Sequence, residues 1–122
     1  MRNKTKTNSY WKGLYGEYLA IFYLRCKGYR ILAWRYKTAV GEIDIVARRG
    51  RSLIFVEVKT RIRLEDALTC FSRRMESRIT RAAQSFISRN PAYAGMDMRF
   101  DFIAVAPFFH ITHLDNAWRP PA

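Results

Sequence analysis

Residues 41–61, GEIDIVARRGRSLIFVEVKTR, contain two short runs that have the composition of β-strands. Residues 41–48 predict one strand and residues 52–60 predict the next, because β-branched, aromatic and other apolar residues recur in both. The tetrad from Arg48 to Arg51 includes a glycine and predicts a tight turn between them. The stretch is therefore expected to fold as a β-hairpin.

Acidic residues are scarce in this chain, with 10 against 22 lysines and arginines, yet three of them lie in the predicted hairpin. Successive side chains of a strand point to opposite faces, so Asp44 and Glu57 are expected to meet on one face with Lys59 one step along. The predicted faces are Glu42 and Asp44 against Ile43 and Ile45 on the first strand, and Phe55, Glu57 and Lys59 against Val56 and Val58 on the second.

Two carboxylates that converge in a half-buried place repel each other, and a hard divalent cation relieves that repulsion. Mg²⁺ is usually held by one or two carboxylates together with waters and phosphate oxygens, and Mn²⁺ has similar preferences. A lysine two residues beyond Glu57 is placed to orient or deprotonate a metal-bound water. Asp44, Glu57 and Lys59 therefore suit metal-assisted attack on a phosphodiester. The alternative is a cross-strand salt bridge on a solvated sheet face.

The rest of the chain predicts a single α/β domain over residues 13–118, with a basic flexible arm at 1–12 and a tail at 119–122. The order is α-β-β-β-α-β-β, which predicts a central mixed sheet flanked by helices. Residues 61–69 are expected to form an irregular connection or a short helix. The other predicted elements are helices at 13–27 and 71–89 and strands at 29–37, 99–106 and 108–114.

The formal net charge of +12 and the pI near 10.3 predict a polyanionic partner. DNA is the expected partner, and an anionic membrane surface or structured RNA is the alternative. No apolar run approaches the roughly 18 residues that span a bilayer, and no signal-type apolar core follows the N-terminus, so no membrane association is expected. Cys26 and Cys70 have neither metal nor CxxC spacing, which predicts reduced thiols in a cytoplasmic protein.

Several basic or polar residues are candidates for contacts with nucleic-acid phosphates. The predicted turn supplies one group and the second long helix supplies a row along its flank, where a solvated helix face is the alternative. Two further candidates directly follow the lysine. The residues are Arg48, Arg49 and Arg51 in the turn, Thr60 and Arg61 after the lysine, and Arg74, Arg78 and Arg81 on the helix.

Two acids outside the hairpin have different predicted roles. Glu17 is the only charged residue from Gly13 to Leu24, on the apolar stripe expected to face the sheet. Its sequence context fits equally an ion pair with an arginine such as Arg35 and a direct catalytic role. Asp101, within RFDFIAV, is expected to anchor the sheet through a salt bridge.

Asp44 followed thirteen residues later by Glu57-Val58-Lys59 resembles the PD-(D/E)XK nuclease signature. The motifs GEYLAIFYLRCKGYRIL, GEIDIVA, FVEVKTR, RFDFIAV and HLDNAW resemble the YraN family of predicted endonucleases, small bacterial proteins related to archaeal Holliday-junction resolvases. The resemblance covers about residues 13–118 and implies a restriction-endonuclease-like fold. It implies Asp44, Glu57 and the Val58 carbonyl as metal ligands and Lys59 as the catalytic lysine, with Glu17 matching an acid often found on the first helix.

The chain departs from the nuclease pattern in two places. Ile43 replaces the proline before the first acid, and RRMESR at the start of the second long helix lacks a lysine that relatives often carry there. Arg73, Arg74 or Arg78 are the candidates to replace it.

The expected function is that of a metal-dependent endonuclease that hydrolyses DNA, with branched, flapped or junction DNA in repair or recombination as candidate substrates. The alternative is a non-catalytic nucleic-acid-binding accessory protein on a nuclease fold. Resolvase-like cutting of two strands would require two active sites and therefore a homodimer.

Overall fold

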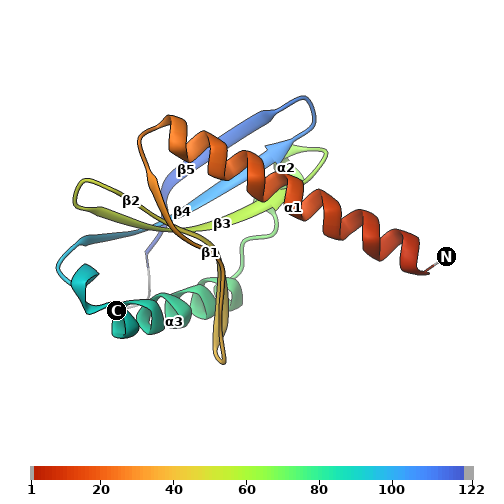
Figure 1. Cartoon of the computed structure of the whole chain (residues 1–122). Helices are drawn as coiled ribbons and strands as arrows, with labels where there is room; N and C mark the ends of the chain where they lie inside the picture. The colour runs from red at the N-terminus through yellow and green to blue at the C-terminus, as the bar shows by residue number, and fades with distance from the viewer. Residues whose placement is uncertain (1, 120–122) are drawn as a thin grey trace.

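The protein is a five-stranded mixed sheet with helices on both faces (Figure 1). The computed structural model describes residues 2–119, with side chains described from Gly13 onward. The elements, in chain order, are α1 (Arg2–Cys26), β1 (Arg30–Thr38), β2 (Gly41–Arg49), β3 (Ser52–Thr60), α2 (Leu64–Leu68), α3 (Arg73–Arg89), the 3-10 helix η1 (Pro91–Tyr93), β4 (Asp97–Ala106) and β5 (His110–Trp118).

The strands lie in the order β1-β2-β3-β4-β5. All neighbouring pairs are antiparallel except β3 and β4, which are parallel and are joined by the crossover through α2 and α3. The predicted mixed α/β sheet flanked by helices is confirmed. Strand β5 extends to Trp118, beyond the predicted end at Leu114, and the Trp118 ring stacks on Phe100 with centroids 4.2 Å apart.

Helix α1 covers one face of the sheet, where Ala20 and Leu24 pack against strand residues that include Ile45, Val56 and Ile103. Helix α1 begins at Arg2 rather than at the predicted Gly13, so the segment predicted as a basic arm at residues 1–12 is helical from Arg2 onward. The segment contains no proline or glycine, and extending an existing helix is less costly than nucleating a new one. No helix within residues 2–119 is long and apolar enough to cross a membrane.

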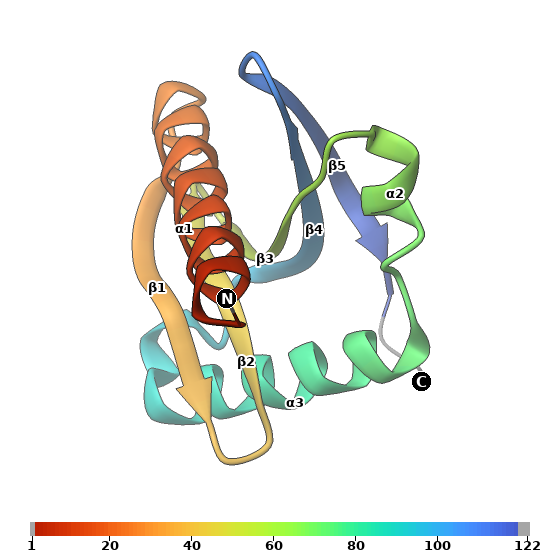
Figure 2. The same ribbon diagram turned by 90° about the vertical axis from the view of Figure 1, so that its right-hand side faces the viewer.

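Helix α3 covers the opposite face (Figure 2) and buries the side chains of Ile79, Ala82, Ala83 and Phe86. Phe86 contacts Phe55 edge-on, with ring centroids 6.0 Å apart. The helix begins after Ser72, whose hydroxyl accepts from the Met75 amide, and ends before Asn90. Of the predicted tail at 119–122, residues 120–122 lie outside the described residues.

Candidate active site

Strands β2 and β3 separate part-way along their length. Their pairing runs from Arg49 opposite Ser52 to Ile45 opposite Val56 and stops there. Beyond this point β2 remains paired with β1 as far as Gly41, and β3 remains paired with β4. Asp44 and Glu57 are the first residues past the last pair, so both acids lie where the two strands diverge. We call this place the fork.

The divergence changes the direction of β2. Ile43 packs in the cluster under α3, whereas Ile45 packs in the cluster under α1. The prediction that these two isoleucines share a face is therefore wrong, because β2 no longer follows a regular ladder with β3 at Asp44. On β3 the predicted alternation is confirmed, since Phe55 lies under α3 while Val56 and Val58 lie under α1.

Asp44 fills the gap at the fork. Its Oδ2 accepts a hydrogen bond of 2.8 Å from the backbone amide of Val58, a donor that β2 no longer satisfies through its main chain. Burial raises the pKa of Asp44 well above its usual value, and the negative charge of Glu57 raises it further. The Val58 hydrogen bond only partly offsets these effects, so the ionised form of Asp44 is poorly compensated.

Glu57 and Lys59 lie two residues apart on the same face of β3, as predicted. Lys59 Nζ is 3.2 Å from Glu57 Oε1, and the Glu57 side chain is 13% exposed. Burial raises the pKa of Glu57, and the neighbouring Lys59 charge opposes that increase without cancelling it. The fork thus holds two destabilised carboxylates and one ammonium group.

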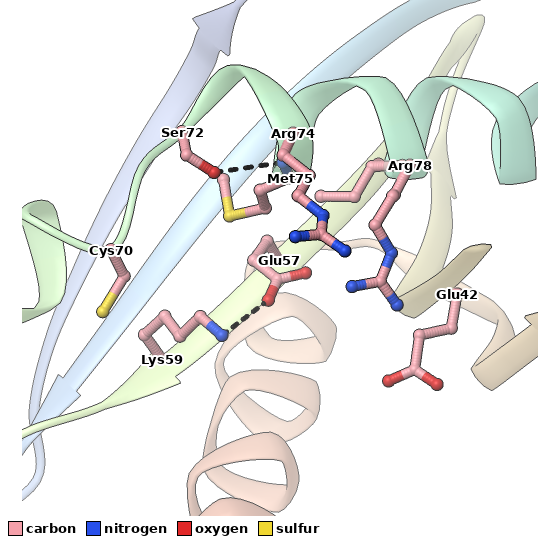
Figure 3. Close-up of a pocket in the computed structure, with 9 residues that line it drawn as sticks. Glu42, Glu57, Lys59, Cys70, Ser72, Arg74, Met75 and Arg78 are labelled. Carbon is pink, nitrogen blue, oxygen red and sulfur yellow. Dashed lines mark hydrogen bonds and ion pairs between the residues drawn. The ribbon is translucent and has the colours of Figure 1, made fainter.

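Two cavities adjoin at the fork and share Glu42, Glu57 and Lys59. One, of about 260 Å³, lies between β3 and α3 and is also lined by Arg74 and Arg78. Figure 3 shows both guanidinium groups directed into this cavity near Glu57, with Glu42 across from them. The other, of about 310 Å³, is also lined by Glu17, Asp44, Thr60 and Arg61.

Helix α3 approaches the fork closely because Gly41 has no side chain. A Cβ at Gly41 would overlap the backbone carbonyl of Arg78, so only glycine permits this contact. Neither Arg74 nor Arg78 forms an ion pair with any side chain among residues 13–119. The cavity therefore presents two arginine side chains whose charges are available to an anion.

Glu17 is held by two donors from β1. Arg35 binds both carboxylate oxygens, at 3.1 and 3.0 Å, and Trp34 Nε1 donates to Oε1 at 2.9 Å. Adjacent strand residues normally point to opposite faces, but Arg35 has a left-handed backbone with φ of 55°, and Trp34 and Arg35 both reach Glu17. Of the two roles left open for Glu17, the structure shows the ion pair with Arg35, which leaves Glu17 close enough to raise the pKa of Asp44.

The turn arginines do not join the fork. They lie at the other end of β2 and β3, roughly 15–20 Å away at the rise of an extended strand. Arg48 and Arg49 donate to the carbonyls of Gly50 and Lys27, and Arg51 donates to that of Gly95. Their contact with nucleic-acid phosphates stays a prediction, and any such phosphates would lie at this distance from the fork.

The other residues predicted to contact phosphates differ in exposure and in their distance from the fork. The Thr60 hydroxyl oxygen is buried without a hydrogen-bond partner among the described residues and packs against Gly16, so it is not accessible to a phosphate. Arg61 is exposed at the cavity rim and donates to the Thr60 carbonyl at 2.7 Å. Arg81 is exposed on α3 but lines neither cavity of the fork.

The carboxylate oxygens at the fork suit a hard divalent cation that needs few ligands from the protein. Among the described residues, no group of three or more His, Cys, Asp or Glu side chains is placed to hold a metal ion. Asp44 and Glu57 make a pair, and a pair of carboxylates with waters and substrate oxygens is the usual protein share of an Mg²⁺ site. The raised pKa values of both acids mark a place where a cation would be stabilising.

Comparison with known proteins identifies relatives over nearly the whole chain. The model of a family described as "Uncharacterised protein family UPF0102" matches residues 16–105, which include Asp44, Glu57 and Lys59. A UPF0102 protein of Chelativorans sp. (strain BNC1) is 46% identical over 114 residues, covering 93% of this chain and 92% of that protein. A UPF0102 protein of Parvibaculum lavamentivorans is 46% identical over 112 residues, covering 92% of this chain and 84% of that protein.

Proposed function

The chain belongs to protein family UPF0102, and we propose that it is a metal-dependent endonuclease that hydrolyses phosphodiester bonds of DNA. The observation that carries the proposal is the fork, where Asp44 and Glu57 are buried with raised pKa values beside Lys59. A cavity at the same place presents Arg74 and Arg78 without ion-pair partners among the described side chains. Buried acids with raised pKa values next to available cations suit a site that receives both a metal ion and a phosphate.

Each group at the fork has a role in this proposal. Asp44 and Glu57 would hold the cation, with the Val58 carbonyl as the predicted third ligand. A bound divalent cation supplies an activated water and neutralises charge on the phosphate. Lys59 donates to the water or to the oxygen on which charge develops, and it is already oriented by Glu57 at 3.2 Å. Arg74 and Arg78 bind the phosphates on either side of the scissile bond.

The proposal extends to the fold family and the cellular setting. We assign the sheet, with its parallel β3-β4 crossover and its acids at the β2-β3 fork, to the restriction-endonuclease-like class that the PD-(D/E)XK resemblance implies. Cys26 and Cys70 are free thiols, in keeping with a reducing compartment such as the cytoplasm. Repair or recombination, with a homodimer for paired cuts, is the setting that the resemblance suggests.

A non-catalytic DNA-binding role is the second candidate. The observation in its favour is that the described residues hold no group of three metal-binding side chains. The charge of +12 would serve such a protein equally well. However, a pure binder gains nothing from two buried acids with raised pKa values next to its phosphate-binding arginines, so the nuclease is the better account.

A cleavage assay separates the two. Labelled linear, single-stranded, flapped and four-way-junction DNA would be incubated with Mg²⁺, Mn²⁺ or EDTA. Wild type should cut only with a divalent cation, and Lys59→Ala should lower the rate by about 100-fold or more, because its donor acts in the transition state. Lys37→Ala is the matched control, since Lys37 is an exposed strand lysine that lines neither cavity.

The control variant should cut at nearly the wild-type rate, apart from the small effect of one lost surface charge. If wild type binds one of these DNAs tightly but cuts none of them with either cation, the accessory-binder account replaces the nuclease.

A further inference from the structure

The turn between β4 and β5 carries two adjacent phenylalanines, Phe108 and Phe109, which we call the aromatic tip. Their exposed fractions are 88% and 67%, so neither ring belongs to the core. Both residues have left-handed backbones, with φ of 64° and 60°. Asn and Gly adopt this conformation readily, whereas bulky side chains are strained in it. Neither burial nor turn geometry therefore explains phenylalanine at these positions.

An apolar cavity of about 440 Å³ lies beside the aromatic tip. Its apolar lining comes from Tyr15, Ile62, Val105, Ala106 and Pro107. The Tyr15 ring is 6.3 Å from the Phe109 ring, so the tip packs against a residue that lines the cavity, although neither phenylalanine lines it. The volume is within the range of about 300–1,000 Å³ that is typical of pockets for small organic groups.

The cavity adjoins the fork. Thr60 and Arg61 line both this cavity and the one that contains Asp44, Glu57 and Lys59. A group in the apolar cavity would therefore be a near neighbour of a phosphate at the fork. Strained residues that persist next to a candidate active site are a usual mark of function.

We propose that the aromatic tip and the apolar cavity bind an unpaired base next to the phosphate that the fork holds. This inference rests on the proposed function and specifies its substrate class as DNA with unpaired nucleotides, such as a flap or the branch point of a junction. Bases inside a duplex are stacked and cannot reach such a cavity without being extruded, whereas unpaired bases can stack on aromatic rings at little cost.

The charges around the cavity favour nucleic acid over an apolar protein partner. Arg61 is exposed at the junction of the two cavities, where it can contact the backbone of the same nucleotide. Asp66, at the rim, offers an acceptor for an exocyclic amino group of a base. The net charge of +12 also favours a polyanion.

The turn geometry provides a variant that removes both rings without unfolding the hairpin. Phe108→Asn with Phe109→Gly places the two residues best suited to positive φ in this turn, so thermal stability should stay at the wild-type level or rise. Phe22→Ala is the matched control, because Phe22 is also 68% exposed but lines neither the apolar cavity nor those of the fork.

Binding would be measured by fluorescence anisotropy in EDTA on a blunt duplex and on the same duplex with a short unpaired flap. A 2-aminopurine in the flap, next to the branch, would report base stacking. Wild type and Phe22→Ala should prefer the flapped DNA and change the 2-aminopurine signal. The double variant should bind the flap on the order of tenfold more weakly, bind the blunt duplex unchanged, and leave the 2-aminopurine signal unaltered.

Equal flap binding by wild type and the double variant would overturn the inference, as would an equal loss on both DNAs. It would also be overturned if the double variant instead turned a dimer into a monomer in sedimentation, which would identify the aromatic tip as a contact between two copies. Cleavage in Mg²⁺ tests the proposed function separately. Ring-dependent flap binding without any cleavage would keep this inference and reject the nuclease.

Discussion

Two buried aspartates on the same sheet, Asp101 on β4 and Asp44 on β2, differ in how their charge is compensated. Asp101 accepts hydrogen bonds from three residues, and Asp44 accepts one from the Val58 amide. Burial raises the pKa of Asp44 well above its usual value, whereas the partners of Asp101 lower its pKa. The difference separates a structural acid from a candidate functional one.

Asp101 is surrounded by donors. Arg99 binds both of its oxygens at 2.8 Å, His113 Nε2 donates to Oδ2 at 2.7 Å, and the Asn116 amide donates to Oδ1 at 3.0 Å. The Asn116 amide is available because β5 bulges opposite Asp101, where Asn116 has a φ of 50°. Burial opposes the charge of Asp101, but the hydrogen bonds from Arg99 and His113 outweigh it. The predicted sheet anchor is confirmed.

The fork also contains carboxylates and nearby cationic side chains, but these are paired differently. Cations are near, but Lys59 pairs with Glu57, Arg35 pairs with Glu17, and Arg74 and Arg78 form no ion pair with a described side chain. Among the side chains of residues 13–119, none forms an ion pair with Asp44. Such an arrangement lowers the stability of the fold, and it is usually found at active sites.

The largest expected effect comes from removing the compensated acid. Asp101→Asn should lower the free energy of unfolding by about 3 kcal/mol, because Arg99 and His113 lose their buried partner. Chemical denaturation measures this value. Asp97→Asn on the same strand is the matched control, since Asp97 is exposed, and it should change stability little. Similar losses from both variants would mean that the network around Asp101 contributes nothing specific.

A smaller effect of opposite sign is expected at the fork. Asp44→Asn keeps an oxygen to accept from Val58 but removes the uncompensated charge, so at neutral pH in EDTA it should raise the free energy of unfolding by about 1 kcal/mol. Denaturation of this variant beside Glu42→Gln, an exposed acid on the same strand, provides the measurement. A loss of stability in Asp44→Asn would contradict the claim that the charge of Asp44 is poorly compensated.

The contributions of Asp44 and Asp101 to stability should depend on pH in opposite ways. The pKa of Asp44 is raised in the folded state, so Asp44 costs wild type no stability below the ordinary value near 3.8, where the carboxyl is protonated. That cost develops as pH rises from there through the raised pKa. The advantage of Asp44→Asn should therefore vanish in acid. The folded pKa of Asp101 is lowered, so its contribution is present above about 3.8 and is lost as pH falls further. Unfolding curves of the two variants across acidic pH should thus converge on wild type from opposite sides.

Much of the candidate site could be predicted because strand alternation is a local property. The shared face of Glu57 and Lys59 follows from the period of two along β3. Asp44 does meet Glu57 as predicted, although β2 departs from that period at Asp44. The same geometry also places the turn arginines at the far end of the strands from Asp44. This position agrees with their expected place in a basic turn that is separate from the acids.

Other features depend on contacts that no local pattern contains. The separation of β2 from β3 at Ile45 reverses the side of Ile43, and it arises where β2 passes against the backbone of α3 through Gly41. The left-handed Arg35, which brings Trp34 and Arg35 together on Glu17, is likewise set by tertiary structure. A glycine or asparagine at position 35 would have signalled such a backbone, but arginine does not.

The central claim is that the two buried acids at the fork, Asp44 and Glu57, receive a divalent cation. Isothermal titration of Mn²⁺ into the full chain tests it most directly, comparing wild type, Asp44→Asn with Glu57→Gln, and Glu42→Gln. The account predicts saturable Mn²⁺ binding at a single site in wild type and in Glu42→Gln, and none in the double variant. Equal binding by wild type and the double variant, or no binding by wild type, would contradict it.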